Sequence, residues 1–170
     1  MSARRAPSAR RVGAGRRAFR VLNRFMLRFW WVGSGRMLNA WPAGTGRILV
    51  LGHVGRRSGL LRRTPLNYAP VGPDLFCVAG FGEGSDWYRN VLAHPEVRVW
   101  LPGDPIGGDG TAGRAEPADD DPDRTALVRQ VLAASGFAAH LAGVHVGRLD
   151  DAALARRTVG YRLVRIRPAR

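Results

Sequence analysis

A short arginine-rich segment carries the clearest chemical signal in this 170-residue sequence. Two glycines enclose two arginines and a serine, and two more arginines and a threonine follow. These residues are Gly55, Arg56, Arg57, Ser58, Gly59, Arg62, Arg63 and Thr64. Glycines let the backbone curl until its N–H groups converge as an anion-binding nest, and guanidinium and hydroxyl groups bind phosphate well. The pattern predicts an anion site; the alternative is a solvated basic hairpin turn.

A glycine-rich loop, residues 80–84, forms the second motif. It runs from an expected strand into an expected helix, which Ser85 or Asp86 can cap and which ends before Pro95. Such a junction is another place where anions and cofactors bind. The G-x-G-x-G spacing differs from a dinucleotide fingerprint, and no crossover unit surrounds it. Asn90 lies inside the expected helix, where packing does not readily explain it.

The chain around both motifs shows short runs of period-two hydrophobicity separated by turn residues, which predict strands. The expected strands are residues 48–53, 60–69, 75–79, 97–101, 111–116 and 160–167. A helix is expected from about Asp123 to Ala134, after an acidic first turn. Because regular helical crossovers do not separate the strands, we predict a mainly β (α+β) fold built on a small barrel.

A basic arm, residues 1–15, precedes an amphipathic helix predicted for residues 16–31. At about 100° per residue, its arginines fall opposite an apolar face. That face comprises Ala18, Leu22, Phe25, Met26 and Phe29. We expect it to pack on the barrel; peripheral contact with an anionic membrane surface, on the inner face of the cell membrane, is the alternative. We therefore divide the chain into residues 1–46, the arm, helix and loop, and residues 47–170, the barrel domain.

The charge is uneven, and every basic residue is an arginine. The net charge is +14, and 15 of the 27 arginines lie in residues 1–63, where no carboxylate occurs. The lack of lysine excludes Schiff-base chemistry and a phosphate-loop lysine. The single cysteine, Cys77, excludes an internal disulfide or a cysteine-ligated zinc cluster, so we expect a cytoplasmic protein and no metal site. No nucleic-acid partner is expected, because no recognised nucleic-acid-binding module is present.

In combination, these motifs resemble the deazaflavin-dependent nitroreductase and quinone reductase family. Residues 55–59, 62–66, 86–90 and 94–97 carry the resemblance. It implies an FMN-binding-like split β-barrel that binds coenzyme F420, a 5-deazaflavin with a phosphate and a lactyl-oligoglutamate tail. It also implies an oxidoreductase that transfers hydride between this coenzyme and a small organic acceptor such as a quinone, nitro compound or activated alkene. A split barrel that binds FMN or haem is the alternative.

The resemblance also implies which residues form the site. The coenzyme would contact Gly55, Arg56, Arg57, Ser58, Gly59, Arg62, Arg63, Thr64, Pro65, Leu66, Ala79, Gly80, Phe81, Gly82, Trp87, Tyr88, Arg89 and Asn90. The segment before the last strand departs from the family, because Phe137 and His140 stand where relatives place tyrosines. We predict that Trp41, Phe137 and His140 contact the substrate. His140 is also the candidate acid, since histidine titrates near neutrality. A homodimer is left open.

Overall fold

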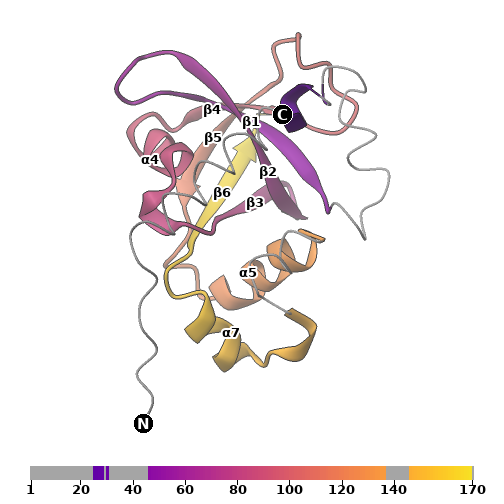
Figure 1. The fold of residues 1–170 in the computed structure, drawn as a ribbon, viewed down its shortest axis with the longest axis vertical. Coiled ribbons are helices and arrows are strands. Elements are labelled where there is room, and N and C mark those ends of the chain that lie inside the picture. Colours follow the sequence, from indigo (N-terminus) through magenta and orange to yellow (C-terminus); the bar gives the residue numbers. More distant parts are fainter. Residues whose placement is uncertain (1–24, 29, 31–45, 137–145, 170) are drawn as a thin grey trace.

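The computed structural model describes residues 25–28, 30, 46–136 and 146–169. Six strands of this part of the chain close into an antiparallel barrel (Figure 1). They are β1 (Ile48–Val54), β2 (Leu61–Val71), β3 (Asp74–Ala79), β4 (Glu96–Trp100), β5 (Thr111–Pro117) and β6 (Arg162–Pro168). The helical elements are η1 (Gly82–Gly84), α4 (Asp86–Ala93), α5 (Arg124–Ala133), η2 (Val146–Arg148) and α7 (Asp151–Arg157). The predicted α+β barrel is confirmed.

The strands follow the order β1-β2-β3-β6-β5-β4 around the barrel. Most neighbours are consecutive in the chain, but β3 pairs with β6, and β4 closes the barrel against β1. Because β1 and β3 both run antiparallel to β2, the last residues of β1 and β3 reach the same end of the barrel as the first residue of β2. We call this end, which holds Val54, Leu61 and Ala79, the arginine-turn end. The β2–β3 turn at Gly72 lies at the opposite end.

Alternation along the strands fills the barrel with apolar side chains. These side chains form one interior cluster. Leu49 and Leu51 of β1 are fully buried in it, and Tyr88 and Val91 of α4 belong to it as well. Burying one such aliphatic side chain contributes roughly 1.5–3 kcal/mol. Helix α4 therefore packs at the arginine-turn end through the same core as β1. This shared packing fixes the polar residues of α4 in position relative to β1.

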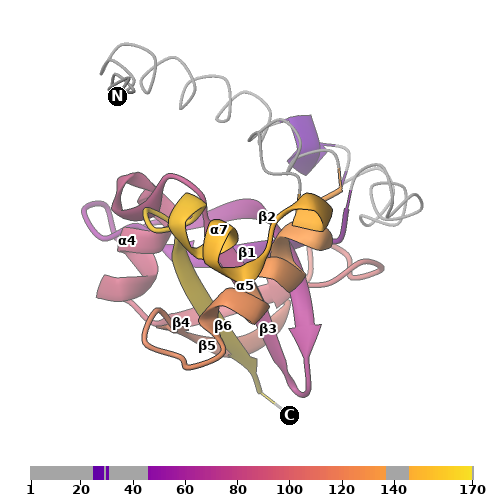
Figure 2. The same cartoon turned by 90° about the horizontal axis from the view of Figure 1, so that it is seen from below.

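A second cluster lies outside the sheet, under α5 and α7. Val128 and Val131 of α5 and Leu154 of α7 pack with Phe76 of β3 and Leu163 of β6. Figure 2 shows the two helices side by side across these strands. Helix α5 confirms the predicted helix at this position. Helix α7 was not predicted; its N-terminus is capped by the Asp150 side chain, which accepts a hydrogen bond from the Ala153 N–H at 2.6 Å.

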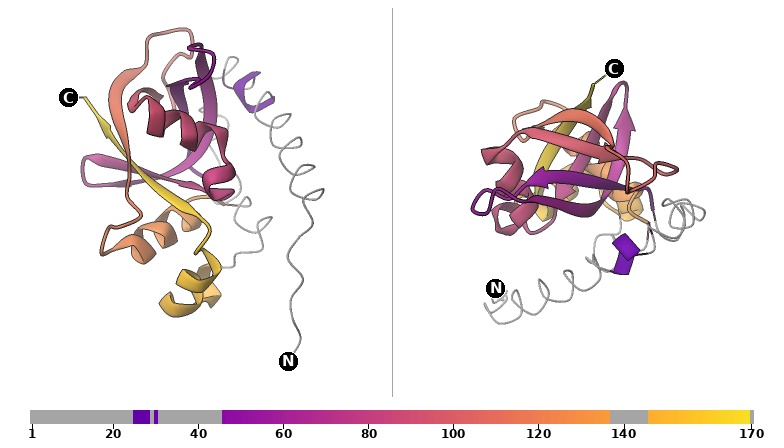
Figure 3. Two further views of the ribbon diagram at one scale, coloured as in Figure 1. Left: turned by 90° about the vertical axis from the view of Figure 1, so that its left-hand side faces the viewer. Right: turned by 90° about the horizontal axis from the view of Figure 1, so that it is seen from above.

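The helical residues 25–28 and 30 pack on the outer face of the barrel (Figure 3). Trp30 is fully buried in a cluster with Trp100 and Ile106, and its indole N–H donates to the Asp104 carbonyl at 3.3 Å. Phe25, which we placed on the packed face, is 60% exposed instead. That detail of the prediction is wrong, because the packed side runs through Met26, Leu27 and Trp30. No helix of the described residues is long and apolar enough to cross a membrane.

Candidate active site

Helix α4 and the arginine turn, residues 55–59, are bound to each other at one barrel end. The backbone N–H and the guanidinium of Arg56 both donate to Oδ1 of Asn90, at 3.1 and 3.0 Å. The same guanidinium lies 3.4 Å from Asp86 at the start of the helix. Asn90 is 3% exposed, so the acceptor in this pairing is buried. The two motifs of the sequence therefore meet in one place, and Asn90 has a role that packing alone did not suggest.

The arginine turn uses its own N–H groups to close itself. The N–H groups of Ser58 and Gly59 donate to the Gly55 carbonyl at 3.0 and 2.8 Å, and the Gly55 N–H donates to Leu60 at 2.9 Å. Gly59 has a φ of 65°, a conformation that favours glycine. These three donors, and the Arg56 N–H that donates to Asn90, already have acceptors, so they do not form the predicted anion nest. An anion at this turn would be bound by side chains.

Two guanidinium groups beside the turn are available for such an anion. Arg57 and Arg62 are exposed, and Arg62 donates to the Ser58 hydroxyl at 3.3 Å. Within residues 46–136 and 146–169, no carboxylate pairs with either arginine. Several later arginines are paired: Arg165, for example, lies 2.6 Å from Asp121. Two uncompensated positive charges thus lie side by side at the arginine-turn end.

The alternation of β2 separates the five residues predicted to bind the coenzyme on that strand. Arg62 and Thr64 pair with His53 and Leu51, on the side that faces the barrel interior, and Leu66 packs against the interior cluster. Arg63 and Pro65 lie on the outer face. There the Arg63 guanidinium lies 4.8 Å from the centre of the Trp100 ring. A ligand on one side of β2 can therefore contact only one of these two sets of side chains directly.

His53 is a buried residue of the site that the motif analysis missed. Its Nδ1 lies 3.1 Å from Nδ2 of Asn90, and its Nε2 lies 3.0 Å from Oγ1 of Thr64. Burial, and then the positive charge of Arg62, lower the pKa of His53 to about 4, so the imidazole is neutral at pH 7. A sequence signal did exist: His53 occupies an inward position at the end of an otherwise apolar strand.

The glycine loop between β3 and α4 combines one constrained glycine with one open glycine. Gly82 has a φ of 53°, and a Cβ there would lie 2.2 Å from the Gly160 carbonyl oxygen. Gly80 is exposed, and a Cβ there would meet nothing within 4 Å. The loop therefore presents accessible backbone at Gly80. Gly82 instead lies against Gly160, in the turn between α7 and β6.

The aromatic residues predicted on α4 serve mainly to pack the helix. Tyr88 is buried in the barrel core, which raises the pKa of its phenol, and Trp87 packs against the same cluster. Arg89 is bound to Asp86 at 3.1 Å. Phe81, in the preceding loop, is 42% exposed. Of the residues predicted on this helix, Asn90 alone connects the arginine turn to His53 in the described structure.

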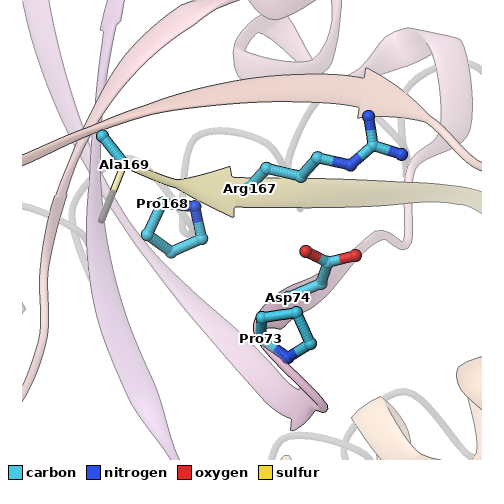
Figure 4. Close-up of a pocket in the computed structure, with 5 residues that line it drawn as sticks. All are labelled: Pro73, Asp74, Arg167, Pro168 and Ala169. Carbon is cyan, nitrogen blue, oxygen red and sulfur yellow. The ribbon is translucent and has the colours of Figure 1, made fainter.

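A surface pocket of about 460 Å³ lies at the opposite end of the barrel, between the start of β3 and the end of β6 (Figure 4). Its lining residues are Pro73, Asp74, Arg167, Pro168 and Ala169. None of them belongs to the predicted site. Trp41, Phe137 and His140 lie outside the described residues. In the part of the chain that is described, no group of three or more metal-ligating side chains could hold a metal ion.

Comparison with known families identifies the family of this chain. A family model described as F420H(2)-dependent quinone reductase matches residues 24–145. The chain belongs to this family. It is an F420-dependent reductase, and coenzyme F420 is its cofactor. The unpaired Arg57 and Arg62 side chains fit a coenzyme that carries a phosphate and carboxylates. Gly80 leaves room for a ring edge to approach the backbone.

Solved structures similar to this F420-dependent reductase include three split-barrel proteins. An F420-H2 dependent reductase (FDR-A) is 20% identical with a TM-score of 0.47, over 71% of this chain and 93% of that one. The haem storage protein HutZ from Vibrio cholerae is 13% identical with a TM-score of 0.49, over 79% and 87% of the two chains. A pyridoxamine 5'-phosphate oxidase-like protein from Listeria innocua is 14% identical with a TM-score of 0.49, over 73% and 85%. No curated protein sequence matches significantly.

Proposed function

We propose that this F420-dependent reductase reduces a quinone by hydride transfer from the reduced coenzyme, with nitro compounds and activated alkenes as further acceptors. One observation supports this most: the arginine turn and α4 meet through Arg56 and Asn90 and leave Arg57 and Arg62 without carboxylate partners among the described residues. When bound, a 5-deazaflavin supplies a carbon that donates hydride. The protein then has to bind the coenzyme, orient it toward the acceptor and exclude water from the site. It needs no nucleophile for these tasks.

The coenzyme phosphate and tail would be held by the side chains of Arg57, Ser58, Arg62 and Thr64. Each hydrogen bond to a charged group contributes roughly 1.5–3 kcal/mol. The open backbone at Gly80 would meet the polar edge of the ring, with Leu66 nearby on β2. The other predicted contacts flank these groups or hold them in place: Gly55, Arg56, Gly59, Arg63, Pro65, Ala79, Phe81, Gly82, Trp87, Tyr88, Arg89 and Asn90. On this proposal the barrel domain, residues 47–170, carries the coenzyme site.

The coenzyme contacts can be tested by binding. We expect Arg57→Gln and Arg62→Gln each to raise the Kd for F420, followed by fluorescence, about tenfold, since each removes a charged donor. Arg156→Gln is the matched control, because Arg156 is also exposed and unpaired among the described residues but lies on α7. Unchanged affinity in both site variants would contradict the proposed contacts. Tight FMN binding with no response to F420 would favour the FMN alternative.

The acceptor and the acid need separate assays. Anaerobic oxidation of the reduced coenzyme against quinones, nitroaromatics and enones should be fastest with a quinone; turnover of the other classes alone would contradict the quinone proposal. We propose His140 as the acid and Trp41 and Phe137 as substrate contacts, all outside the described residues. An unchanged rate of quinone reduction in His140→Ala would remove that role.

We also propose that the side of the N-terminal helix left exposed makes peripheral contact with an anionic membrane. Phe25 and Arg28 are exposed while Trp30 is packed on the barrel, so both groups are available to a lipid surface. Phe25→Asp should reduce co-sedimentation with anionic vesicles without affecting F420 binding. Equal co-sedimentation of the variant and the parent protein would contradict the contact. Sedimentation velocity of the same samples shows whether the protein is a homodimer.

A further inference from the structure

Four residues, from the arginine turn, α4, β1 and β2, form one series of hydrogen bonds with a defined direction. Oδ1 of Asn90 accepts from the N–H and the guanidinium of Arg56, so this amide must turn its Nδ2 toward His53. An amide nitrogen only donates, hence Nδ1 of His53 is the acceptor. A neutral imidazole with a bare Nδ1 carries its proton on Nε2. That N–H donates to the Thr64 hydroxyl oxygen at 3.0 Å.

The direction of these hydrogen bonds decides whether the Thr64 hydroxyl can donate to a ligand. A hydroxyl has one proton and can rotate it toward any acceptor. Because Oγ1 of Thr64 accepts from His53, its own proton has to point elsewhere. The hydrogen bonds of the described residues give that proton no acceptor. Thr64 is half-buried, and its neighbour on the same side of β2, Arg62, is exposed and cationic.

We propose that His53 is a positioning residue that makes the Thr64 hydroxyl a dedicated donor to an anionic oxygen of the ligand. The inference rests on the proposed function and specifies it: the oxygen belongs to the phosphate or to a tail carboxylate of the coenzyme. His53 itself does not touch the ligand in this role. It acts by holding the Thr64 hydroxyl in one orientation before binding, so that less freedom is lost when the ligand arrives.

The buried surroundings keep this arrangement constant. His53 is 2% exposed, and burial together with Arg62 lowers its pKa to about 4. The other charge that affects it, the Asp86 carboxylate, raises the pKa but does not offset burial. At pH 6–8 the ring therefore stays neutral, with one tautomer selected by Asn90. Because Nε2 of His53 keeps its proton, the Thr64 hydroxyl does not donate to the imidazole.

A double-mutant cycle on F420 binding tests the proposal. Thr64→Val keeps the side-chain shape and should raise the Kd about tenfold, the effect of losing one hydrogen bond to a charged group. His53→Phe should do the same, and the double variant should bind no more weakly than Thr64→Val alone. Thr111→Val, the same change at an exposed strand position, is the control. Independent, multiplying effects of the two substitutions would overturn the positioning role.

The ligand can be varied to identify the oxygen. A deazaflavin that lacks the phosphate and tail should bind Thr64→Val and the parent protein equally. If Thr64→Val weakens both ligands by the same factor, the hydroxyl serves the ring, and the anionic assignment is overturned. Failure of the parent protein to bind F420 would instead contradict the proposed function, and the two failures are thus distinguishable.

Nitrogen NMR of the parent protein supplies a test that does not require any variant to fold. With ¹⁵N-labelled histidine, His53 should give the neutral Nε2–H tautomer throughout pH 6–8, with or without ligand. A neutral Nδ1–H tautomer, or an imidazolium at pH 7, would overturn the proposal, because Thr64 would then face a different group.

Discussion

The side-chain amide of Asn90 lies 3.1 Å from Nδ1 of His53 and joins α4 to β1. Asn90→Asp keeps the shape and still accepts from Arg56, but it cannot donate to the imidazole. We expect His53 to acquire a proton on Nδ1 and its pKa to rise from about 4, because a buried carboxylate favours the imidazolium. A ¹⁵N NMR pH titration measures this. Asn67→Asp, at a half-buried amide on β2, is the control; an unchanged His53 titration in Asn90→Asp would refute the assignment.

The lowered pKa of His53 predicts a loss of stability in mild acid. The folded-state pKa is about 4 and the ordinary value is 6.5, so between these pH values the unfolded chain binds the extra proton. Stability therefore falls as the pH drops through 6.5 and stops falling on this account below 4. One pKa unit corresponds to about 1.4 kcal/mol, which makes the loss about 3 kcal/mol.

Urea unfolding at pH 7.5 and pH 4.5 measures this loss. Ion-paired carboxylates also contribute in acid, so the comparison is with His53→Gln, which cannot titrate in this range. The parent protein should lose roughly 2–3 kcal/mol more than the variant between the two pH values. Parallel losses in both proteins would mean that His53 is not the group responsible.

Two glycines of the β3–α4 loop should respond differently to the same substitution. Gly82→Ala puts a Cβ against the Gly160 carbonyl at a positive φ, and we expect a loss of about 2 kcal/mol or more. Gly80→Ala meets open space and should change stability by less than about 1 kcal/mol. Thermal unfolding separates the two. If the ring approaches the backbone at Gly80, Gly80→Val should weaken F420 binding in a protein of unchanged stability.

The helical residues near the N-terminus should contribute to barrel stability through one side chain. Trp30→Ala removes a fully buried indole and its hydrogen bond to Asp104, so we expect a loss of about 3–5 kcal/mol. Phe25→Ala, at a side chain that is 60% exposed, should change stability by less than about 0.5 kcal/mol. Chemical denaturation measures both. Equal small effects would indicate that this helix does not pack stably on the barrel.

Most strands and one helix could be predicted from local sequence patterns. Period-two runs predicted the strands within a few residues, because alternation of side chains is a property of each strand alone. The segment before α5 predicted that helix from its acidic first turn. Helix α7 was missed because its sequence has a single fully buried side chain, Leu154, and hence little periodic signal. Phe25 was misplaced because a short helix can turn either flank of its apolar stripe toward the barrel.

The sequence by itself determined the residue types of the site, the two motifs and the family they indicate. It could not show that most N–H groups of the arginine turn already have acceptors, nor which of Arg62 and Arg63 lies on the interior side of the barrel. Those facts depend on strand pairing and barrel closure. The contact between His53 and Asn90 spans 37 residues of chain. It forms only when α4 packs into the barrel end, so tertiary structure alone decided which ring nitrogen keeps its proton.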